Sequence, residues 1–176
     1  MGMIACFQMV DNQCISQLLE KDEDELFEII EEMQEDDDSV LDLDKLWDGL
    51  HFLLTGTEAC DSIDRNMFGE STEENLLSES IIGKSRFIDD KDADHIAYSL
   101  FESVVKISDA LSVFDIDQAI DGFQPKEFRR KDIYPGIWRD EDRESLQEEL
   151  KDSFCELKSF YEKAVEYKKG IVVSIY

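Results

Sequence analysis

The sequence LDLDKLWDGLHFLLTGTEA, residues 41–59, combines a helix start, an apolar face and a helix stop. Either Asp42 or Asp44 can act as N-cap by accepting a hydrogen bond from a free amide of the first turn. Gly56 stands where a left-handed C-terminal cap favours glycine. The segment therefore predicts an amphipathic helix from about Leu43 to Thr55. Leucines at three- and four-residue spacing form its apolar face, namely Leu43, Leu46, Leu50, Leu53 and Leu54.

Polar and aromatic side chains lie beside this leucine face. Trp47, His51 and Thr55 are four residues apart, so we expect them to stack along one strip of the helix. A histidine can exchange a proton near neutral pH, and an indole can stack on a ring. One interpretation is a ligand pocket, whose lining would be Trp47, Asp48, His51, Thr55 and Thr57. The alternative is that Trp47 and His51 are structural and pack beneath the terminal strands.

Apolar runs at the two ends of the chain predict strands. They are Met3–Val10 and the β-branched run Ile171–Tyr176. A strand at the C-terminus has no downstream partner, so the N-terminal strand is its expected neighbour. Two segments between them are polar and predict loops, Glu35–Asp38 and Glu58–Gly69, and Arg86–Ile88 is compatible with irregular structure or a short edge strand.

The rest of the chain predicts helices. In chain order they lie around Cys14–Leu19, from Asp22 to about Met33, from Ser71 to Ser80, from Asp89 or Asp90 to Ile107, at Ile116–Ile120, and from about Asp140 to Lys169. The expected fold class is therefore α+β. It is a predominantly helical single domain, residues 1–176, with a small sheet that pairs the N-terminal and C-terminal strands.

Length and cysteine usage favour a cytoplasmic protein. A chain of 176 residues can bury a core without disulfides or metals. No apolar run approaches the ~18 residues that cross a bilayer, and the opening MGMIACFQMV lacks the basic start of a signal peptide. The four cysteines form no CxxC pair, which favours buried, reduced thiols. We expect no metal and no cofactor, because the two histidines have no partner at ligand spacing and glycine-rich phosphate loops are absent.

The net charge of −26 is concentrated in one part of the chain. Residues 20–48 hold 15 acidic residues and two lysines, whereas residues 126–169 hold 12 acidic and 11 basic residues. Such a surface repels nucleic acids and anionic membranes and attracts basic proteins. The acidity is explained either by a solvated helix face or by a surface for a basic protein partner. The residues of that surface would be Glu23, Glu28, Glu31, Glu32, Glu35, Asp36, Asp37 and Asp38.

Four cations stand apart from this acidic segment. Lys126, Arg129, Arg130 and Lys131 form the chain's basic cluster. Among 44 acidic residues, internal salt bridges are a better explanation for them than an anion-binding site.

Three segments resemble one family. The start MGMIACF, the block LDLDKLWDGLHFLLTGT and the run Ile133–Gly136 together are similar to the bacterial YfbM-like family of small cytoplasmic proteins of unknown function. The resemblance extends over nearly the whole chain, although Asp61–Arg86 matches poorly. It implies an α+β fold and supplies no activity, substrate or cofactor.

Two functions remain open. The first is a non-enzymatic, acidic binding protein that engages a basic protein partner, in the manner of an inhibitor or immunity protein. The alternative is a small-molecule or nucleotide-like ligand-binding protein, or an enzyme, with a pocket around Trp47, His51 and Thr55. The oligomeric state is left open by the sequence.

Overall fold

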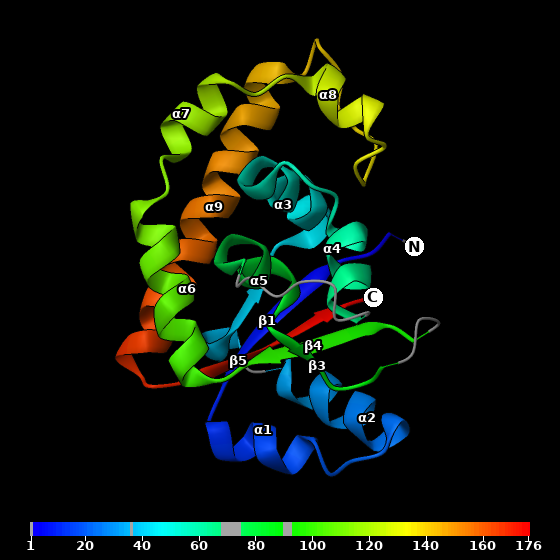
Figure 1. The fold of residues 1–176 in the computed structure, drawn as a ribbon, viewed down its shortest axis with the longest axis vertical. Coiled ribbons are helices and arrows are strands. Elements are labelled where there is room, and N and C mark those ends of the chain that lie inside the picture. Colours follow the sequence, from blue (N-terminus) through cyan, green and yellow to red (C-terminus); the bar gives the residue numbers. More distant parts are fainter. Residues whose placement is uncertain (1, 36, 68–74, 90–92) are drawn as a thin grey trace.

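A five-stranded antiparallel sheet organises the described part of the chain (Figure 1). The structure is a computed structural model that describes residues 2–35, 37–67, 75–89 and 93–176. The strand order is β2-β1-β5-β4-β3. The strands are β1 (Ala5–Val10), β2 (Val40–Asp42), β3 (Ser85–Arg86), β4 (His95–Ser99) and β5 (Gly170–Ile175).

The two ends of the chain meet at the centre of this sheet. β1 and β5 are paired along their whole length, from Ala5 opposite Ile175 to Val10 opposite Gly170. Every residue of both strands is buried. The predicted pairing of the terminal strands and the α+β fold class are therefore confirmed.

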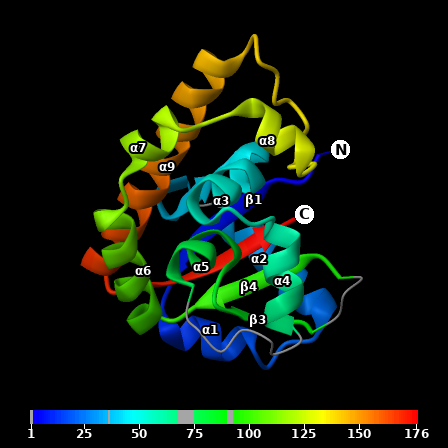
Figure 2. The same ribbon diagram turned by 45° about the horizontal axis from the view of Figure 1, so that its top comes forward.

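Helices cover both faces of the sheet (Figures 1 and 2). On one face lie α1 (Asn12–Leu18) and α2 (Glu23–Met33), which bury Ile15, Leu18, Leu26 and Ile30. On the other face the main helices are α3 (Trp47–Thr55), α5 (Leu76–Ile82), α6 (Phe101–Val113) and α9 (Arg143–Glu166). Neighbouring strand residues serve opposite faces, so Val172 packs with α1 and α2 while Val173 packs in the larger core.

The remaining described elements are short. They are α4 (Ala59–Met67), α7 (Ile116–Asp121), α8 (Pro125–Arg130) and the 3₁₀ turns η1 (Asp37–Ser39) and η2 (Asp44–Leu46). The predicted helix at residues 43–55 thus begins as a 3₁₀ turn and becomes α-helical at Trp47. Gly56 ends it with φ of 72°, as its cap position predicts.

The predicted helix over residues 89–107 is wrong in its first half. Residues 95–99 form β4, and α6 begins only at Phe101. β4 fills the place beside β5, where Ala97 lies opposite Val173. Because helices cover both faces of the sheet, Ile96 and Ala97 are both buried, and the alternation that marks a strand is lost.

The predicted loop over residues 58–69 is also wrong, because residues 59–67 form α4. The amide of its first residue, Ala59, donates to the Asp48 carboxylate of α3 at 3.1 Å. α5 begins at Leu76, with the Asn75 side chain accepting a hydrogen bond from the Ser78 amide at 3.2 Å. The predicted capping pair at residues 71 and 74 lies outside the described residues.

Candidate functional site

His51 lies at the centre of a buried hydrogen-bond network. Its Nδ1 is 3.0 Å from the Thr57 carbonyl oxygen, and its Nε2 is 2.7 Å from the Ser78 hydroxyl. Since a carbonyl oxygen only accepts, Nδ1 carries the proton and donates it, and Nε2 accepts from Ser78. The side chain is 0% exposed, and burial lowers its pKa to about 4. His51 is therefore neutral at pH 7, with both nitrogens engaged.

The turn after α3 uses its own polar groups. The Thr55 hydroxyl donates to the His51 carbonyl at 2.8 Å and accepts from the Thr57 amide at 3.1 Å. These contacts close the turn around Gly56. The Thr55 hydroxyl and the Thr57 amide, from two residues of the expected pocket, thus serve the local structure.

Asp48 and Trp47 connect α3 to distant segments. The Asp48 carboxylate accepts hydrogen bonds from the Ala59 amide at 3.1 Å and the Tyr134 amide at 3.0 Å. Burial raises the pKa of this carboxyl group, and the two amide hydrogen bonds oppose that rise. Trp47 is 1% exposed and donates from Nε1 to the Met3 carbonyl at 3.3 Å. His51, Thr55 and Thr57 are thus joined by hydrogen bonds, whereas Trp47 and Asp48 bond to other segments, and this geometry favours a structural role for His51.

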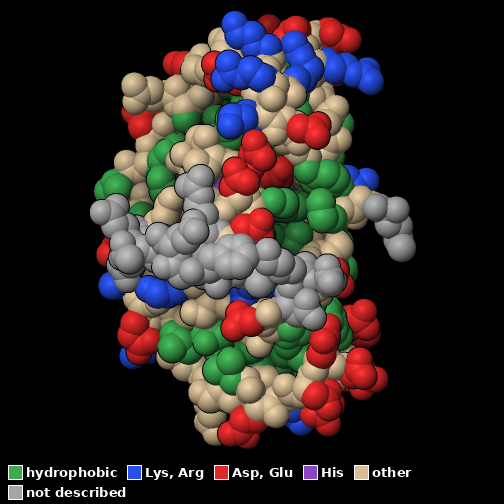
Figure 3. Space-filling view, turned by 45° about the vertical axis from the view of Figure 1, so that its right-hand side comes forward, with side chains coloured by type: hydrophobic (Ala, Val, Ile, Leu, Met, Phe, Trp, Pro, Cys, Tyr) green, Lys and Arg blue, Asp and Glu red, His purple; other side chains and the backbone are tan. Residues whose placement is uncertain are grey.

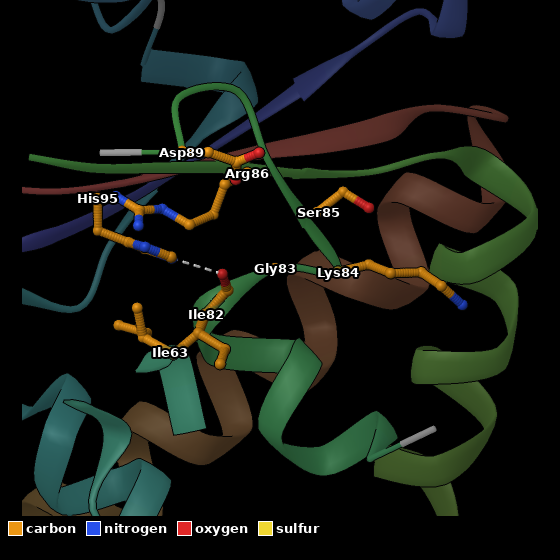
Figure 4. A pocket seen from close by; sticks show the side chains of 8 residues that line it. All are labelled: Ile63, Ile82, Gly83, Lys84, Ser85, Arg86, Asp89 and His95. Carbon is orange, nitrogen blue, oxygen red and sulfur yellow. Dashed lines mark hydrogen bonds between the residues drawn. The ribbon is translucent and has the colours of Figure 1, made fainter. Parts of the chain in front are cut away.

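A crevice of about 170 Å³ lies below the β3–β4 hairpin (Figure 4). α4 contributes Ile63, the end of α5 contributes Ile82, and the hairpin contributes Arg86, Asp89 and His95. The Arg86 side chain runs toward His95, while the Lys84 side chain points away from it (Figure 4). None of these residues belongs to the pocket expected from the sequence.

His95 is held in one tautomer at this crevice. Its Nε2 donates to the Ile82 carbonyl oxygen at 2.7 Å, so the neutral ring keeps its lone pair on the buried Nδ1. Burial, aided by the nearby Arg86 cation, lowers its pKa to about 4. Sequence spacing could not reveal this arrangement, because the hairpin register brings together residues with no common motif. The signal available was that His95 is one of only two histidines.

A second hollow, of about 290 Å³, adjoins the crevice and shares Ile63, Arg86 and His95 with it. It is also lined by Trp47 and Cys60. Partial burial raises the pKa of the Cys60 thiol, and the carboxylates of Asp48 and Asp64 raise it further. The thiol is therefore protonated at neutral pH, which disfavours a nucleophilic role.

The cysteines are free but not all buried. Cys6 is buried and Cys14 is partly buried, whereas Cys60 and Cys155 are exposed. The expectation of buried thiols is wrong for the latter two.

The acidic residues of α2 form an exposed face. Leu26 and Ile30 hold the helix against the sheet, and Asp22 caps it by accepting from the Glu25 amide at 3.0 Å. Carboxylates gather at the α1–α2 end of the molecule, while Lys and Arg gather at the α8 end (Figure 3). The exposed members of the predicted surface are Glu23, Glu28, Glu31, Glu32, Glu35 and Asp38; Asp36 and the side chain of Asp37 lie outside the described residues.

Two cations of the basic cluster form ion pairs. Arg129 contacts Asp140 at 2.9 Å and donates to the Trp138 carbonyl at 2.6 Å. Lys131 lies 3.8 Å from Glu58. The predicted internal salt bridges are confirmed for these two residues.

Two general features complete the description. Across residues 2–35, 37–67, 75–89 and 93–176, three or more potential metal-ligating side chains do not gather at any point. In the same residues, no helix is both long and apolar enough to cross a membrane.

Comparison with known proteins places the chain in a family. The model of a family described as a domain of unknown function, DUF1877, matches residues 1–174. Protein YfbM of Escherichia coli (strain K12) is 31% identical over 144 residues, which cover 82% of this chain and 80% of YfbM. The crystal structure of YfbM from Escherichia coli, described as a protein of unknown function, matches with a TM-score of 0.75 and 24% identity over 98% of this chain and 99% of that one. The chain therefore belongs to the DUF1877, or YfbM-like, family.

Proposed function

We propose that this protein is a non-enzymatic binding protein whose acidic α2 face engages a basic protein partner. The observation that supports it most is the set of exposed carboxylates on a helix anchored by Leu26 and Ile30. Lys21, just before this helix, pairs with Glu25 at 3.1 Å and balances little of that charge. We propose that this face acts as a preformed anionic surface.

Electrostatic attraction would act mainly on the rate of association. A dense anionic surface steers a cationic protein toward it before contact, and the effect weakens as salt screens the charges. This behaviour suits an inhibitor-like or immunity-like role, in which rapid capture of a basic target matters.

The experiment uses two variants with equal loss of charge. One carries Glu23→Gln, Glu28→Gln, Glu31→Gln and Glu32→Gln on α2, and the control carries Glu144→Gln, Glu148→Gln, Glu162→Gln and Glu166→Gln on exposed positions of α9. Partners captured by the native protein are identified, and association rates are measured by surface plasmon resonance from 50 to 500 mM KCl. We expect the α2 variant to associate about tenfold more slowly at low salt, and the α9 variant to stay near the native rate. Association rates that do not change with ionic strength, or an equal decrease of the rate in both variants, would refute the proposal.

A second candidate function, binding of a small molecule, is supported by the crevice at His95 and not by His51. Its volume of about 170 Å³ is comparable with the ~150 Å³ cavity that binds benzene in an engineered protein. A screen of metabolites that follows the NMR signals of the two histidine rings would test small-molecule binding in this crevice. A ligand in the crevice should shift the His95 signals and leave those of the sealed His51 unchanged; shifts in neither ring would exclude this site.

A further inference from the structure

An open groove of about 550 Å³ lies where two of the sequence segments with family resemblance meet. Asp42–Leu46, at the end of β2 and in η2, forms one wall. The turn that follows Ile133 forms another wall, and one side of α9 closes the groove. These three segments are distant in sequence, so the groove exists only in the folded chain.

Buried contacts hold the first two walls in place. The Asp48 carboxylate accepts from the Tyr134 amide at 3.0 Å, and the Trp47 and Tyr134 rings lie 6.1 Å apart. Trp47 is itself tied to the N-terminal segment through the Met3 carbonyl. The shape of the groove is therefore set by the same network that fixes α3.

The groove combines apolar and acidic groups. Leu46, Tyr134 and Pro135 are half-buried along it, and Ile137 is 41% exposed. These four apolar side chains line one groove, and a contiguous apolar surface, unlike a single exposed side chain, is a candidate contact for a partner.

Carboxylates stand around these apolar groups. Asp42 and Asp44 come from the β2–η2 wall, and Glu149 and Glu156 come from α9, with Lys45 as the groove's cation. All four carboxylate residues are exposed. The groove therefore complements a ligand that places cations on either side of an apolar side chain.

We infer that this groove binds a short basic peptide segment in which an apolar residue is flanked by lysine or arginine. The apolar side chain would cover Ile137 and Leu46, and the flanking cations would face Glu149 and Glu156 on one side and Asp44 on the other. This inference does not rest on the α2 proposal, because no groove residue belongs to α2.

Three capped peptides test the chemistry of the occupant. They are Ac-Gly-Lys-Leu-Lys-Gly-NH₂, its Leu→Ser counterpart and its Lys→Glu counterpart. Binding is followed by amide NMR shifts at fixed low ionic strength. We expect the first peptide to shift the amides of Leu46, Ile137 and Glu149, with affinity at least about fivefold above that of the serine peptide. The glutamate peptide should not bind.

Matched variants separate the groove from general charge attraction. Glu149→Gln with Glu156→Gln removes two charges from the groove, and Glu162→Gln with Glu166→Gln removes two charges from exposed positions of α9 outside the groove lining. The groove variant should bind the Lys-Leu-Lys peptide about fivefold more weakly than the native protein does. The control variant should lose less than about twofold in affinity. Ile137→Ser should lower the affinity for this peptide about as much as the groove variant does, and the rest of the amide NMR spectrum of the protein should stay unchanged.

Three results would overturn the inference. They are equal weakening by both charge variants, equal affinity for the leucine and serine peptides, and no shift at the groove amides at millimolar peptide. The first two would show nonspecific charge attraction, and the third would show an unoccupied groove. Failure of the α2 experiment would leave these results unaffected.

Discussion

His51 shows how burial decides the chemistry of a single side chain. A free imidazole titrates near pH 6.5, but this ring has no exposed surface and two neutral partners. Neither partner can stabilise a positive charge as water does, so the neutral form is favoured. The ring thus joins α3 to the turn at Thr57 and to α5 through Ser78.

Truncation of this ring tests its structural role. His51→Ala leaves the Thr57 carbonyl and the Ser78 hydroxyl without their partner and opens a cavity, which should lower the free energy of unfolding by about 3 kcal/mol. Urea unfolding measures the change, with the exposed Glu162→Ala as control. A loss below about 1 kcal/mol would contradict the network as a source of stability.

The two histidines also predict how stability depends on pH. Both have a pKa of about 4 in the folded chain against 6.5 as the reference value, so below pH 6.5 the unfolded chain binds protons that the folded chain does not. The free energy of unfolding should therefore fall as the pH falls from 6.5 toward 4, with His51 contributing about 2 kcal/mol of loss by pH 5. The raised pKa of Asp48 opposes this trend at the acidic end.

Urea unfolding at pH 7, 6 and 5 measures this loss, and NMR titration of the folded protein checks its cause. A His51 ring that titrates near pH 6.5 without unfolding would disprove the assignment.

At the level of elements, the carboxylate of Asp48 connects α3 to α4 and to the turn at Tyr134. Asp48 on α3 caps the first amide of α4 and holds the turn at Tyr134. The sequence of α4 is polar and was therefore predicted to be a loop. A cap supplied from 11 positions away is not visible as a local pattern.

The role of Asp48 can be measured directly. Asp48→Ala removes the acceptor for two amides and should destabilise the fold by about 2 kcal/mol, while Asp48→Asn keeps one acceptor and should cost about 1 kcal/mol. Hydrogen exchange at the Ala59 and Tyr134 amides should accelerate in the alanine variant. The exposed Asp152→Ala on α9 serves as control. Unchanged exchange at both amides would show that the carboxylate does not hold them.

Gly49 tests the packing of α3 against the rest of the core. Alanine is favoured over glycine in a helix by about 1 kcal/mol, yet a Cβ at Gly49 would overlap the ring of Trp138. Gly49→Ala should therefore destabilise the protein by about 2 kcal/mol. At Gly122 the added Cβ would meet only ordinary contacts, so Gly122→Ala is the matched control. The melting temperatures of both variants test this prediction. A higher melting temperature for Gly49→Ala than for the native protein would contradict the close contact between Gly49 and Trp138.

For the whole molecule, the distribution of charge matters as much as its total. The α1–α2 end is acidic and the α8 end carries the basic cluster (Figure 3). The carboxylates of α2 repel one another across an exposed face, and this repulsion is a long-range effect that salt screens.

Stability should therefore rise with moderate salt. Raising KCl from 50 to 500 mM should increase the melting temperature by about 3 °C, because screening relieves repulsion worth about 1 kcal/mol. The variant with four α2 glutamates replaced by glutamine should gain about half as much, whereas the α9 variant should respond like the native protein. An equal response in all three would show that the α2 face is not the main source of repulsion.

Much of the architecture follows from local pattern. The continuous apolar runs at the termini predicted the central strand pair. Apolar residues at helical spacing predicted α2, α3 and α9 with ends displaced by a few residues, and a short helix was also predicted at the place of α7. Gly56 was correctly placed as a helix stop. The crevice at His95 was not predicted, and the pocket around Trp47, His51 and Thr55 stays a prediction, with His51 buried and hydrogen-bonded.

The sequence by itself determined the α+β class, the pairing of the chain ends and the concentration of charge, since these depend on periodicity and composition. Only the tertiary structure decided that residues 95–99 extend a sheet, that Asp48 starts a helix, and which histidine lies beside a crevice. Each of these depends on a partner distant in the chain: β5 for β4, Asp48 for α4, and Ile82 for His95. Local secondary-structure propensity contributes less free energy than burial and a hydrogen bond to such a partner. The tertiary contacts therefore determine the structure of these residues.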